Sequence, residues 1–186
     1  MPVGEVKSIY LTFDDGPHPD TTPWLLDILK AHEAKATFFC LGKNVEKFPA
    51  LFQEIKAQGH AIGSHTFNHL SGWKSGTSAY IDEVERGAAT VHSKLFRPPY
   101  GRIRPAQYKA LINDNYKVIM WSVMAYDFDV ELGSEERIER VRKHTGDGSV
   151  VVFHDSPKAF PQLKNELPGL LDYWKKNNFS FAEIRP

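Results

Sequence analysis

Cysteine is almost absent from this chain of 186 residues, since Cys40 is the only one. A single cysteine excludes an internal disulfide and any zinc site built from several thiolates. An excess of charge of one sign is also missing, because 23 Lys and Arg residues balance 23 Asp and Glu residues. That balance gives no reason to expect binding to nucleic acid or to an anionic lipid surface, and we expect neither partner.

Long hydrophobic runs are missing as well. No segment approaches the roughly 20 apolar residues that a membrane-spanning helix needs. The first ten residues, MPVGEVKSIY, lack the basic and apolar regions of a secretory signal. Removal of an upstream segment would leave the same sequence, so localisation stays open. It would be extracytoplasmic, or at the cell envelope, if such a segment once preceded the chain.

The remaining composition is that of a globular protein. Hydrophobic residues make up 41% and charged residues 25% of the chain, which is typical of a folded domain. A length of 186 residues allows one sizeable core. No internal repeat, linker or low-complexity tract divides the sequence. We therefore expect a single domain over residues 1–186, and a monomer.

Strand-like and helix-like segments alternate along the chain. Short apolar, β-branched runs predict strands at 9–13, 36–39, 60–63, 95–97, 116–123 and 149–153, and FSFAEI closes the chain as another. Apolar residues at helical spacing predict helices between them. One such helix is expected to open with Thr22 as N-cap and Pro23 at the first helical position. Pro168 is expected to kink the last helix or to delay its start.

This alternation is typical of a parallel sheet with helices outside it. About seven strand–helix units share the 186 residues, which gives about 27 residues each. A distorted, incomplete (β/α)7 TIM-like barrel fits this count better than a full eightfold barrel. An open doubly wound sheet is the alternative. In either fold, function is expected at the carboxyl ends of the strands.

Charged or imidazole side chains follow five of the expected strands. They are Asp14 and Asp15 in TFDDGP, His65 and His69 in SHTFNH, Arg97 in RPPYG, Asp127 in YDFD, and His154 in HDS. Because the carboxyl ends of parallel strands meet at one edge, we expect these side chains to lie on one face of the molecule. A structural protein has no evident reason for that arrangement.

Asp14 and Asp15 stand where the first expected strand runs into a Gly-Pro turn, in IYLTFDDGPHPD. Successive side chains of a regular strand point to opposite faces, so adjacent carboxylates cannot share one task there. At the strand end they can diverge to either side of a common point. The alternative is a solvated turn, because Asp-Gly-Pro is ordinary turn sequence.

His65 and His69 lie four residues apart. On one helical turn, this spacing would present both imidazoles to one side, a common way to hold a divalent metal ion. Two imidazoles and one carboxylate form a three-ligand set that leaves positions open for water and substrate. The spacing alone is a weak signal, and the neighbouring acidic pair strengthens it.

Four motifs in order, TFDDGP, SHTFNH, RPPYG and VVFHDS, resemble those of the polysaccharide deacetylases. This family is the NodB-homology domain, carbohydrate esterase family four. The resemblance runs from about Ile9 to Ile184, and it implies a distorted seven-unit barrel. It also implies a metal-dependent hydrolase that removes acetyl groups from a carbohydrate. The substrate would be an N-acetylglucosamine-containing glycan such as peptidoglycan or chitin, or O-acetylated xylan.

The resemblance assigns roles to the first residues of the site. Asp15, His65 and His69 would bind one divalent metal ion. Zinc is the first expectation, and cobalt or nickel suits the same ligands. Asp14 would be the general base that takes a proton from the attacking water. Arg97 would orient and tune Asp14.

Two further roles follow from the same resemblance. His154 would be the general acid, and an imidazole with an ordinary pKa of about 6.5 must be protonated to give the leaving amine its proton. The backbone N–H of Tyr100 would help to hold the oxyanion. A donor of this kind is worth about 3 kcal/mol when it is deleted.

The fourth family motif departs from its usual pattern. The family commonly has Asp-x-x-Asp-Trp, and this chain has MAYDF. Asp127 matches the second aspartate, which the resemblance pairs with Arg97. Met124 replaces the first aspartate, and Phe128 stands in place of the Trp. Phe128 would still offer a flat apolar wall to an acetyl methyl group, with simple core packing as the alternative.

Two other functions remain open. The divergent motif and the lack of a visible signal allow an amidohydrolase of the same fold that acts on a small cyclic amide or ureide. A non-catalytic carbohydrate-binding module is the other, although binding alone requires no general acid. Trp73 and Phe67 could stack on a sugar face, or pack in the core.

Overall fold

The computed structural model describes residues 7–185, so the first six residues and Pro186 of the expected domain lie outside it. The strands are β1 (Lys7–Asp14), β2 (Thr37–Cys40), β3 (Ala61–Ser64), β4 (Leu95–Phe96), β5 (Lys117–Val118), β6 (Val123–Met124), β7 (Val150–His154) and β8 (Phe179–Ala182). The helices are α1 (Thr22–Ala31), α2 (Gly42–Lys47), α3 (Pro49–Ala57), α4 (Thr77–Val91), α5 (Pro105–Asn113), α6 (Ser134–His144) and α7 (Phe160–Lys176). Two 3₁₀ turns, η1 (Gly72–Lys74) and η2 (Pro99–Gly101), complete the elements. None of the helices in residues 7–185 is both long enough and apolar enough to cross a membrane.

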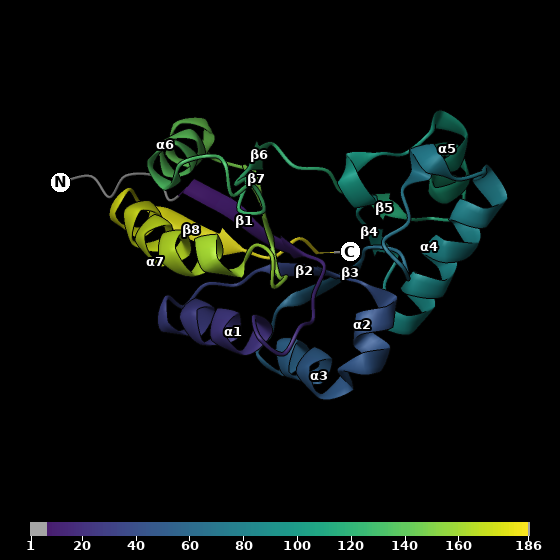
Figure 1. The fold of residues 1–186 in the computed structure, drawn as a ribbon, viewed down its shortest axis with the longest axis horizontal. Coiled ribbons are helices and arrows are strands. Elements are labelled where there is room, and N and C mark those ends of the chain that lie inside the picture. The colour runs from purple at the N-terminus through teal and green to yellow at the C-terminus, as the bar shows by residue number, and fades with distance from the viewer. Residues whose placement is uncertain (1–6, 186) are drawn as a thin grey trace.

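The strands form one parallel sheet in the order β5-β4-β3-β2-β1-β7-β6, and β8 adds to the first half of β1. The helices lie on the outside of the strands (Figure 1). Within residues 7–185, no pairing joins β5 to β6, so the barrel stays open on that side. This arrangement confirms the predicted distorted, incomplete (β/α) barrel.

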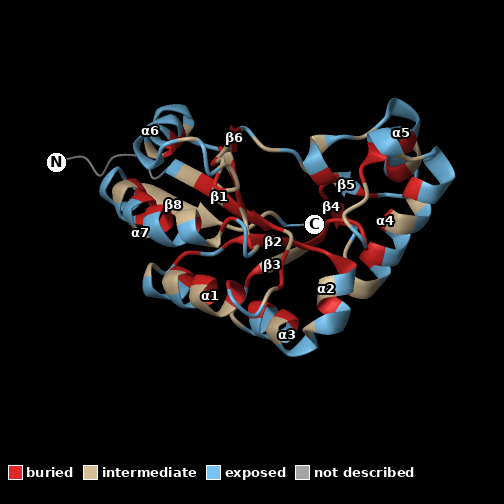
Figure 2. Ribbon diagram, in the orientation of Figure 1, coloured by how far each residue is buried: buried red, intermediate tan, exposed pale blue. Residues whose placement is uncertain are grey.

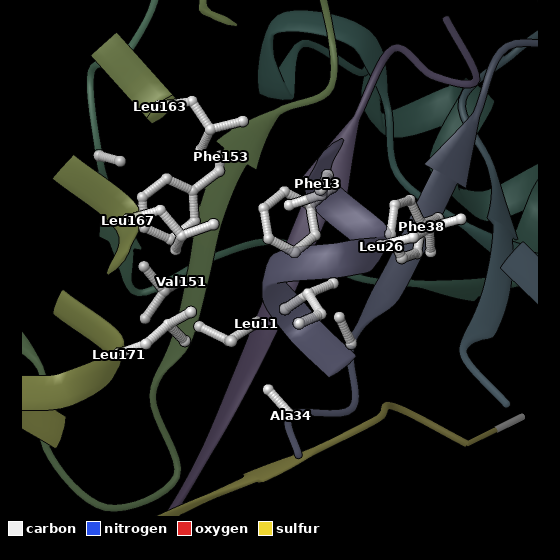
Figure 3. Packing of buried hydrophobic residues seen from close by; sticks show 14 of the residues in the cluster. Leu11, Phe13, Leu26, Ala34, Phe38, Val151, Phe153, Leu163, Leu167 and Leu171 are labelled. Atoms are coloured by element: carbon white, nitrogen blue, oxygen red, sulfur yellow. The ribbon is translucent and has the colours of Figure 1, made fainter. Parts of the chain in front are cut away.

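The main core lies between the sheet and the helices that cover it (Figure 2). Phe13 of β1 packs between two aromatic rings. Its ring centroid lies 5.3 Å from that of Phe38 in β2 and 5.7 Å from that of Phe153 in β7. Leu163, Leu167 and Leu171 of α7 face β7, and Leu26 of α1 faces β2 (Figure 3). These contacts hold β1 firmly at the centre, and β1 carries the paired aspartates at its carboxyl end.

The single strand predicted over 116–123 is wrong. The structure has two short strands there, β5 and β6, with residues 119–122 between them. β5 pairs with β4, whereas β6 pairs with β7, so the chain must cross the open side of the barrel. The carbonyls of Ile119 and Met120 consequently leave the sheet, and they accept hydrogen bonds from the Arg97 guanidinium at 3.2 Å each.

Two expected details of helix ends also differ. Thr21, not Thr22, is the N-cap of α1, and its side chain makes no capping hydrogen bond. Both threonine hydroxyls instead donate to the buried carboxylate of Asp155. The late start proposed for the last helix is not observed, because α7 runs through Pro168. Buried leucines on both sides of this proline pack into the same core, and such packing stabilises a helix against a poor residue.

Candidate metal centre and active site

The predicted site residues gather at the carboxyl ends of the strands, around a cavity of about 340 Å³. The cavity is lined by Asp14, Asp15, His65, His69, Tyr100, Trp121, Met124, Phe128, Val152, His154, Ser156 and Lys158. Arg97 and Asp127 stand behind this lining, and both are buried. All nine residues expected at the site are therefore in the cavity wall or in contact with it.

Asp14 and Asp15 diverge, as predicted. Asp14 is the last residue of β1, where it pairs with Phe39 of β2 and His154 of β7. The backbone then turns at once, because Asp15 has a φ of 81°, in the left-handed region. Asp14 is only 3% exposed, so the alternative of a solvated turn is wrong. One carboxylate turns to Arg97 and the other to the two histidines.

Asp15, His65 and His69 place three ligand atoms within 4.8 Å of one another. The Asp15 Oδ1 atom lies 3.3 Å from His69 Nε2 and 3.8 Å from His65 Nε2. Ligand atoms bound at about 2.1 Å to one tetrahedral ion lie about 3.4 Å apart, which is close to both distances. Asp15 Oδ1 is also buried with no hydrogen-bond partner in residues 7–185. The donor set therefore fits one divalent ion.

The two histidines are not on a helix, contrary to the expectation. Residues 65–69 form a loop in which Thr66 and His69 have φ values of 64° and 67°. The rings still meet, with centroids 5.1 Å apart. Their convergence comes from the irregular path of this loop after β3, which the i, i+4 spacing does not describe.

The surroundings of His65 suit a metal ligand. Its Nδ1 donates to the Arg97 carbonyl at 2.7 Å, which fixes the ring and leaves Nε2 toward Asp15. Burial lowers the pKa of His65 and also that of His69, although nearby carboxylates oppose the shift. The lowered pKa of each ring favours the neutral imidazole that binds a cation. Burial raises the pKa of Asp15, while the charge of His65 works in the other direction.

Asp14 is held by Arg97 from behind. The Arg97 Nη1 atom lies 2.8 Å from Asp14 Oδ1 and 2.7 Å from Thr12 Oγ1. The other oxygen, Oδ2, is 4.0 Å from His65 Nε2, so it faces the metal ligands. Burial lowers the pKa of Arg97, and the charge of Asp14 opposes that shift. The predicted pairing of Arg97 with Asp14 is present, and it leaves one carboxylate oxygen free toward the cavity.

His154 is held by Asp127 on the opposite side. Its Nδ1 donates to Asp127 Oδ1 at 2.8 Å, and its backbone N–H donates to Oδ2 at 2.7 Å. Burial alone would lower the pKa of His154, but the hydrogen bond and charge of Asp127, with Asp14 and Asp15 nearby, raise it to about 9. The ring is therefore protonated at neutral pH.

The expected pairing of Asp127 with Arg97 is wrong. The Arg97 guanidinium is occupied by Thr12, Asp14 and two carbonyls of residues 119–120. Asp127 follows β6, which pairs with β7, and this neighbourhood brings its carboxylate to His154 instead. Asp127 thus lies on the His154 side of the cavity and not on the Asp14 side.

Apolar side chains form the rest of the cavity wall. Phe128 stands edge-on to His154, with ring centroids 5.0 Å apart. Met124, Val152 and Trp121 extend the apolar surface. Tyr100, with a φ of 61° in η2, closes the other side by placing its ring 4.6 Å from that of His69. The cavity therefore has a polar floor and an apolar wall that can accept a small acyl group.

Sequence reasoning gave no role to Asp155, which follows His154. Its backbone N–H donates to the Asp14 carbonyl at 2.7 Å, and its carboxylate accepts from Thr22 at 2.6 Å. A Cβ added at Gly16 would lie 2.2 Å from Asp155 Oδ2, so only glycine fits there. Asp155 thus ties the turn after β1 to β7 and to the start of α1. The only signal in the sequence was the motif HDS, in which this carboxylate directly follows the His154 imidazole.

An open parallel barrel with a His-His-Asp cluster, a separate carboxylate and a protonated imidazole defines a hydrolase of the metal-dependent class. The model of the family described as "Polysaccharide deacetylase" matches residues 3–119, which is more than half of the chain. This chain belongs to the polysaccharide deacetylase family, carbohydrate esterase family four. The matched segment contains Asp14, Asp15, His65, His69, Arg97 and Tyr100, and it ends before Asp127 and His154.

Similar proteins extend the match beyond that segment. A peptidoglycan-N-acetylglucosamine deacetylase of Bacillus cereus is 36% identical over 176 residues, covering 85% of this chain and 64% of the relative. A chitooligosaccharide deacetylase of Azorhizobium caulinodans is 32% identical, covering 80% and 74%. The crystal structure of the Bc1960 peptidoglycan N-acetylglucosamine deacetylase, in complex with an N-hydroxybenzamide, superposes with a TM-score of 0.90 at 31% identity, covering 95% and 86%.

Proposed function

We propose that this protein removes N-acetyl groups from an N-acetylglucosamine-containing glycan such as peptidoglycan or a chitooligosaccharide. The observation that carries the proposal is the buried, unpartnered Asp15 oxygen between two imidazoles, with Asp14 beside it and protonated His154 across the cavity. The names of the relatives, which deacetylate glycans of this kind, support the choice of substrate.

Asp15, His65 and His69 would hold one divalent ion, which zinc, cobalt or nickel could supply. When bound, such an ion lowers the pKa of water from 15.7 to about 7 and polarises a carbonyl oxygen. The chain contributes the geometry of this site, because His65 is fixed by the Arg97 carbonyl and Asp15 by the sharp turn after β1.

Asp14 acts as the general base. Its Oδ1 is engaged by Arg97, and its Oδ2 faces the ligand histidines, so this oxygen is positioned to take the proton of the attacking water. The Arg97 guanidinium holds Oδ1 in a 2.8 Å ion pair and so fixes the orientation of the carboxylate. Arg97 itself does not touch the reacting atoms and is a positioning residue.

His154 acts as the general acid. Its Nδ1 is occupied by Asp127, so Nε2 carries the proton that the leaving amine receives when the amide bond breaks. The pKa of about 9 keeps this proton in place at neutral pH. General acid–base catalysis of this kind contributes about 10²- to 10⁴-fold to a rate.

Tyr100 and Phe128 complete the proposed site. The backbone N–H of Tyr100 would meet the negative charge that develops on the carbonyl oxygen. Phe128, beside His154, would contact the acetyl methyl group with its apolar ring. An ester-linked acetyl group of xylan fits the same chemistry, so the substrate test includes both linkages.

The experiment measures acetate release from N-acetylglucosamine oligomers, peptidoglycan fragments and acetylxylan. We expect release from the first two, loss of activity after chelation, and recovery on addition of one equivalent of zinc, cobalt or nickel. His69→Ala should lose the metal and the activity together, whereas His144→Ala, at an exposed position of α6, should keep both. Activity that survives chelation, or metal-loaded protein inactive on every glycan, would overturn the proposal.

A further inference from the structure

Trp73 is an exposed tryptophan that the proposed reaction does not use. Its exposed fraction is 57%, among the highest for the large apolar side chains of residues 7–185. Tryptophan is highly buried on average, because so much apolar area is costly to leave in water. Phe67, the other aromatic residue considered for sugar stacking, is instead buried with Arg86 over its ring. Trp73 therefore stands out as the exposed member of the two.

The backbone around Trp73 is rigid. The Trp73 carbonyl accepts from Arg104 Nη2 at 2.6 Å, and the preceding Gly72 donates to the Arg102 carbonyl at 3.2 Å. Gln107, buried at the start of α5, donates to the Gly72 carbonyl at 2.9 Å. A Cβ at Gly72 would lie 2.6 Å from the Arg102 carbonyl oxygen, so the two segments approach each other closely.

The ring itself is supported from one side. The Arg102 guanidinium lies over it, 5.1 Å from the ring centroid, in a cation–π contact. A ring held in this way loses little freedom when a ligand binds, and preorganisation of this kind raises affinity. Because Arg102 covers one face, the exposed area of Trp73 offers the other face to a ligand.

Trp73 lies outside the cavity lining, on a segment that leads away from it. Residues 69–73 and 100–104 leave the cavity side by side, since His69 contacts Tyr100 at one end and Trp73 contacts Arg102 at the other. Four residues of chain span at most about 14 Å, so Trp73 lies within that distance of a metal ligand. A glycan with one acetylated sugar in the cavity can therefore bring a neighbouring sugar to Trp73.

We infer that Trp73, backed by Arg102, is a stacking platform for a second sugar residue of the same glycan chain. The inference rests on the proposed function for its substrate. One face of a pyranose ring carries mainly C–H groups, and these pack on an aromatic ring as other apolar groups do. The platform would make the enzyme prefer oligomers that extend beyond the residue being deacetylated.

The test compares kcat/KM for an N-acetylglucosamine pentamer with that for the dimer. In Trp73→Ala, we expect the pentamer-to-dimer ratio to fall about tenfold, the factor expected for one aromatic contact. Trp73→Phe should retain most of the ratio. The matched control is Tyr108→Ala, because Tyr108 is an exposed aromatic residue on α5 that does not line the cavity. An unchanged ratio in Trp73→Ala, or an equal fall in the control, would overturn the inference.

A binding measurement separates this inference from the proposed function. Calorimetry of the pentamer with metal-loaded Asp14→Asn, with and without Trp73→Ala, needs no turnover. Weaker binding in the Trp73→Ala background supports the platform even where the wild-type protein releases no acetate, and the deacetylase proposal then fails alone. Equal affinity in the two backgrounds rejects the platform, whatever the wild-type activity is. Thermal melting of each variant verifies that it is folded.

Discussion

Two ion pairs flank the cavity, and the first presents its anion to the cavity whereas the second presents its cation. In the first pair, the Asp14 carboxylate faces the cavity and the Arg97 cation stands behind it. In the second, the His154 imidazole faces the cavity and the Asp127 carboxylate stands behind it. Each pair has a 2.8 Å contact between its charged atoms. In the proposed mechanism, the group in front takes a proton in the first pair and gives one in the second.

Asp155 is a further buried carboxylate near the cavity, and it can be compared with Asp14. Among residues 7–185, no cation pairs with Asp155, and its carboxylate accepts only from the hydroxyls of Thr21 and Thr22. Burial raises its pKa to about 6, although the two hydroxyls act in the opposite direction. Hydroxyl donors alone thus leave a buried carboxyl partly protonated near neutral pH, which would disable a general base. Asp14, by contrast, has a full cation as its partner, the Arg97 guanidinium.

Of the substitutions in these two ion pairs, Asp14→Asn should have the largest effect on activity. The amide keeps the shape of the side chain but cannot take a proton, so kcat should fall by about 10²- to 10⁴-fold. Steady-state acetate release, with metal content measured in parallel, checks this. Asp20→Asn, with its side chain 70% exposed, is the matched control and should retain full activity. A fall of less than tenfold with metal still bound would remove Asp14 from the role of base.

Arg97→Met tests the stability of the same pair. It leaves the Asp14 carboxylate buried and unpaired, which should lower the free energy of unfolding by about 3–5 kcal/mol. Urea denaturation measures the change. In the double variant with Asp14→Asn, the loss should be smaller, because no unpaired charge is left in the interior. Strictly additive losses would mean that the two side chains do not interact.

Asp127→Asn tests the proposed role of His154 through the pH dependence of kcat/KM. Removal of the carboxylate lowers the pKa of His154 from about 9, so the ring loses its proton at a lower pH. The alkaline limb of kcat/KM should move to lower pH, with about 10- to 100-fold less activity at about pH 8. In Asp14→Asn, which removes a more distant charge, any residual activity should show a smaller shift. An alkaline limb that stays in place would show that His154 does not set it.

Asp155→Asn should act on stability alone, through its pH dependence. The folded protein holds the Asp155 proton more tightly than the unfolded chain does, since the pKa rises from 3.8 to about 6. The protonated Asp155 therefore contributes at most about 3 kcal/mol to the free energy of unfolding. This contribution is fully present below about pH 4 and is lost as the pH rises through about 6. Urea denaturation of the metal-free protein over this range should show a flatter pH dependence in the variant. Parallel curves for the two proteins would contradict this assignment.

Residue types at strand ends predicted which side chains gather around the cavity, because the carboxyl ends of parallel strands meet at one edge whatever the details of the loops. The sequence could not show the partner of Asp127, which depends on β6 pairing with β7 rather than on any local pattern. The loop over residues 65–69 was misjudged for a related reason. Helical spacing is one way to bring two imidazoles together, and positive φ values at Thr66 and His69 are another.

The broken strand over residues 116–123 has a further consequence. The carbonyls of Ile119 and Met120 bridge the unpaired side of the barrel and hold the guanidinium that orients Asp14. Every amino acid has a backbone carbonyl, so side chains at these two positions can drift during evolution without loss of the contact. The length of the connector cannot, because one inserted residue would move both oxygens out of register with Arg97.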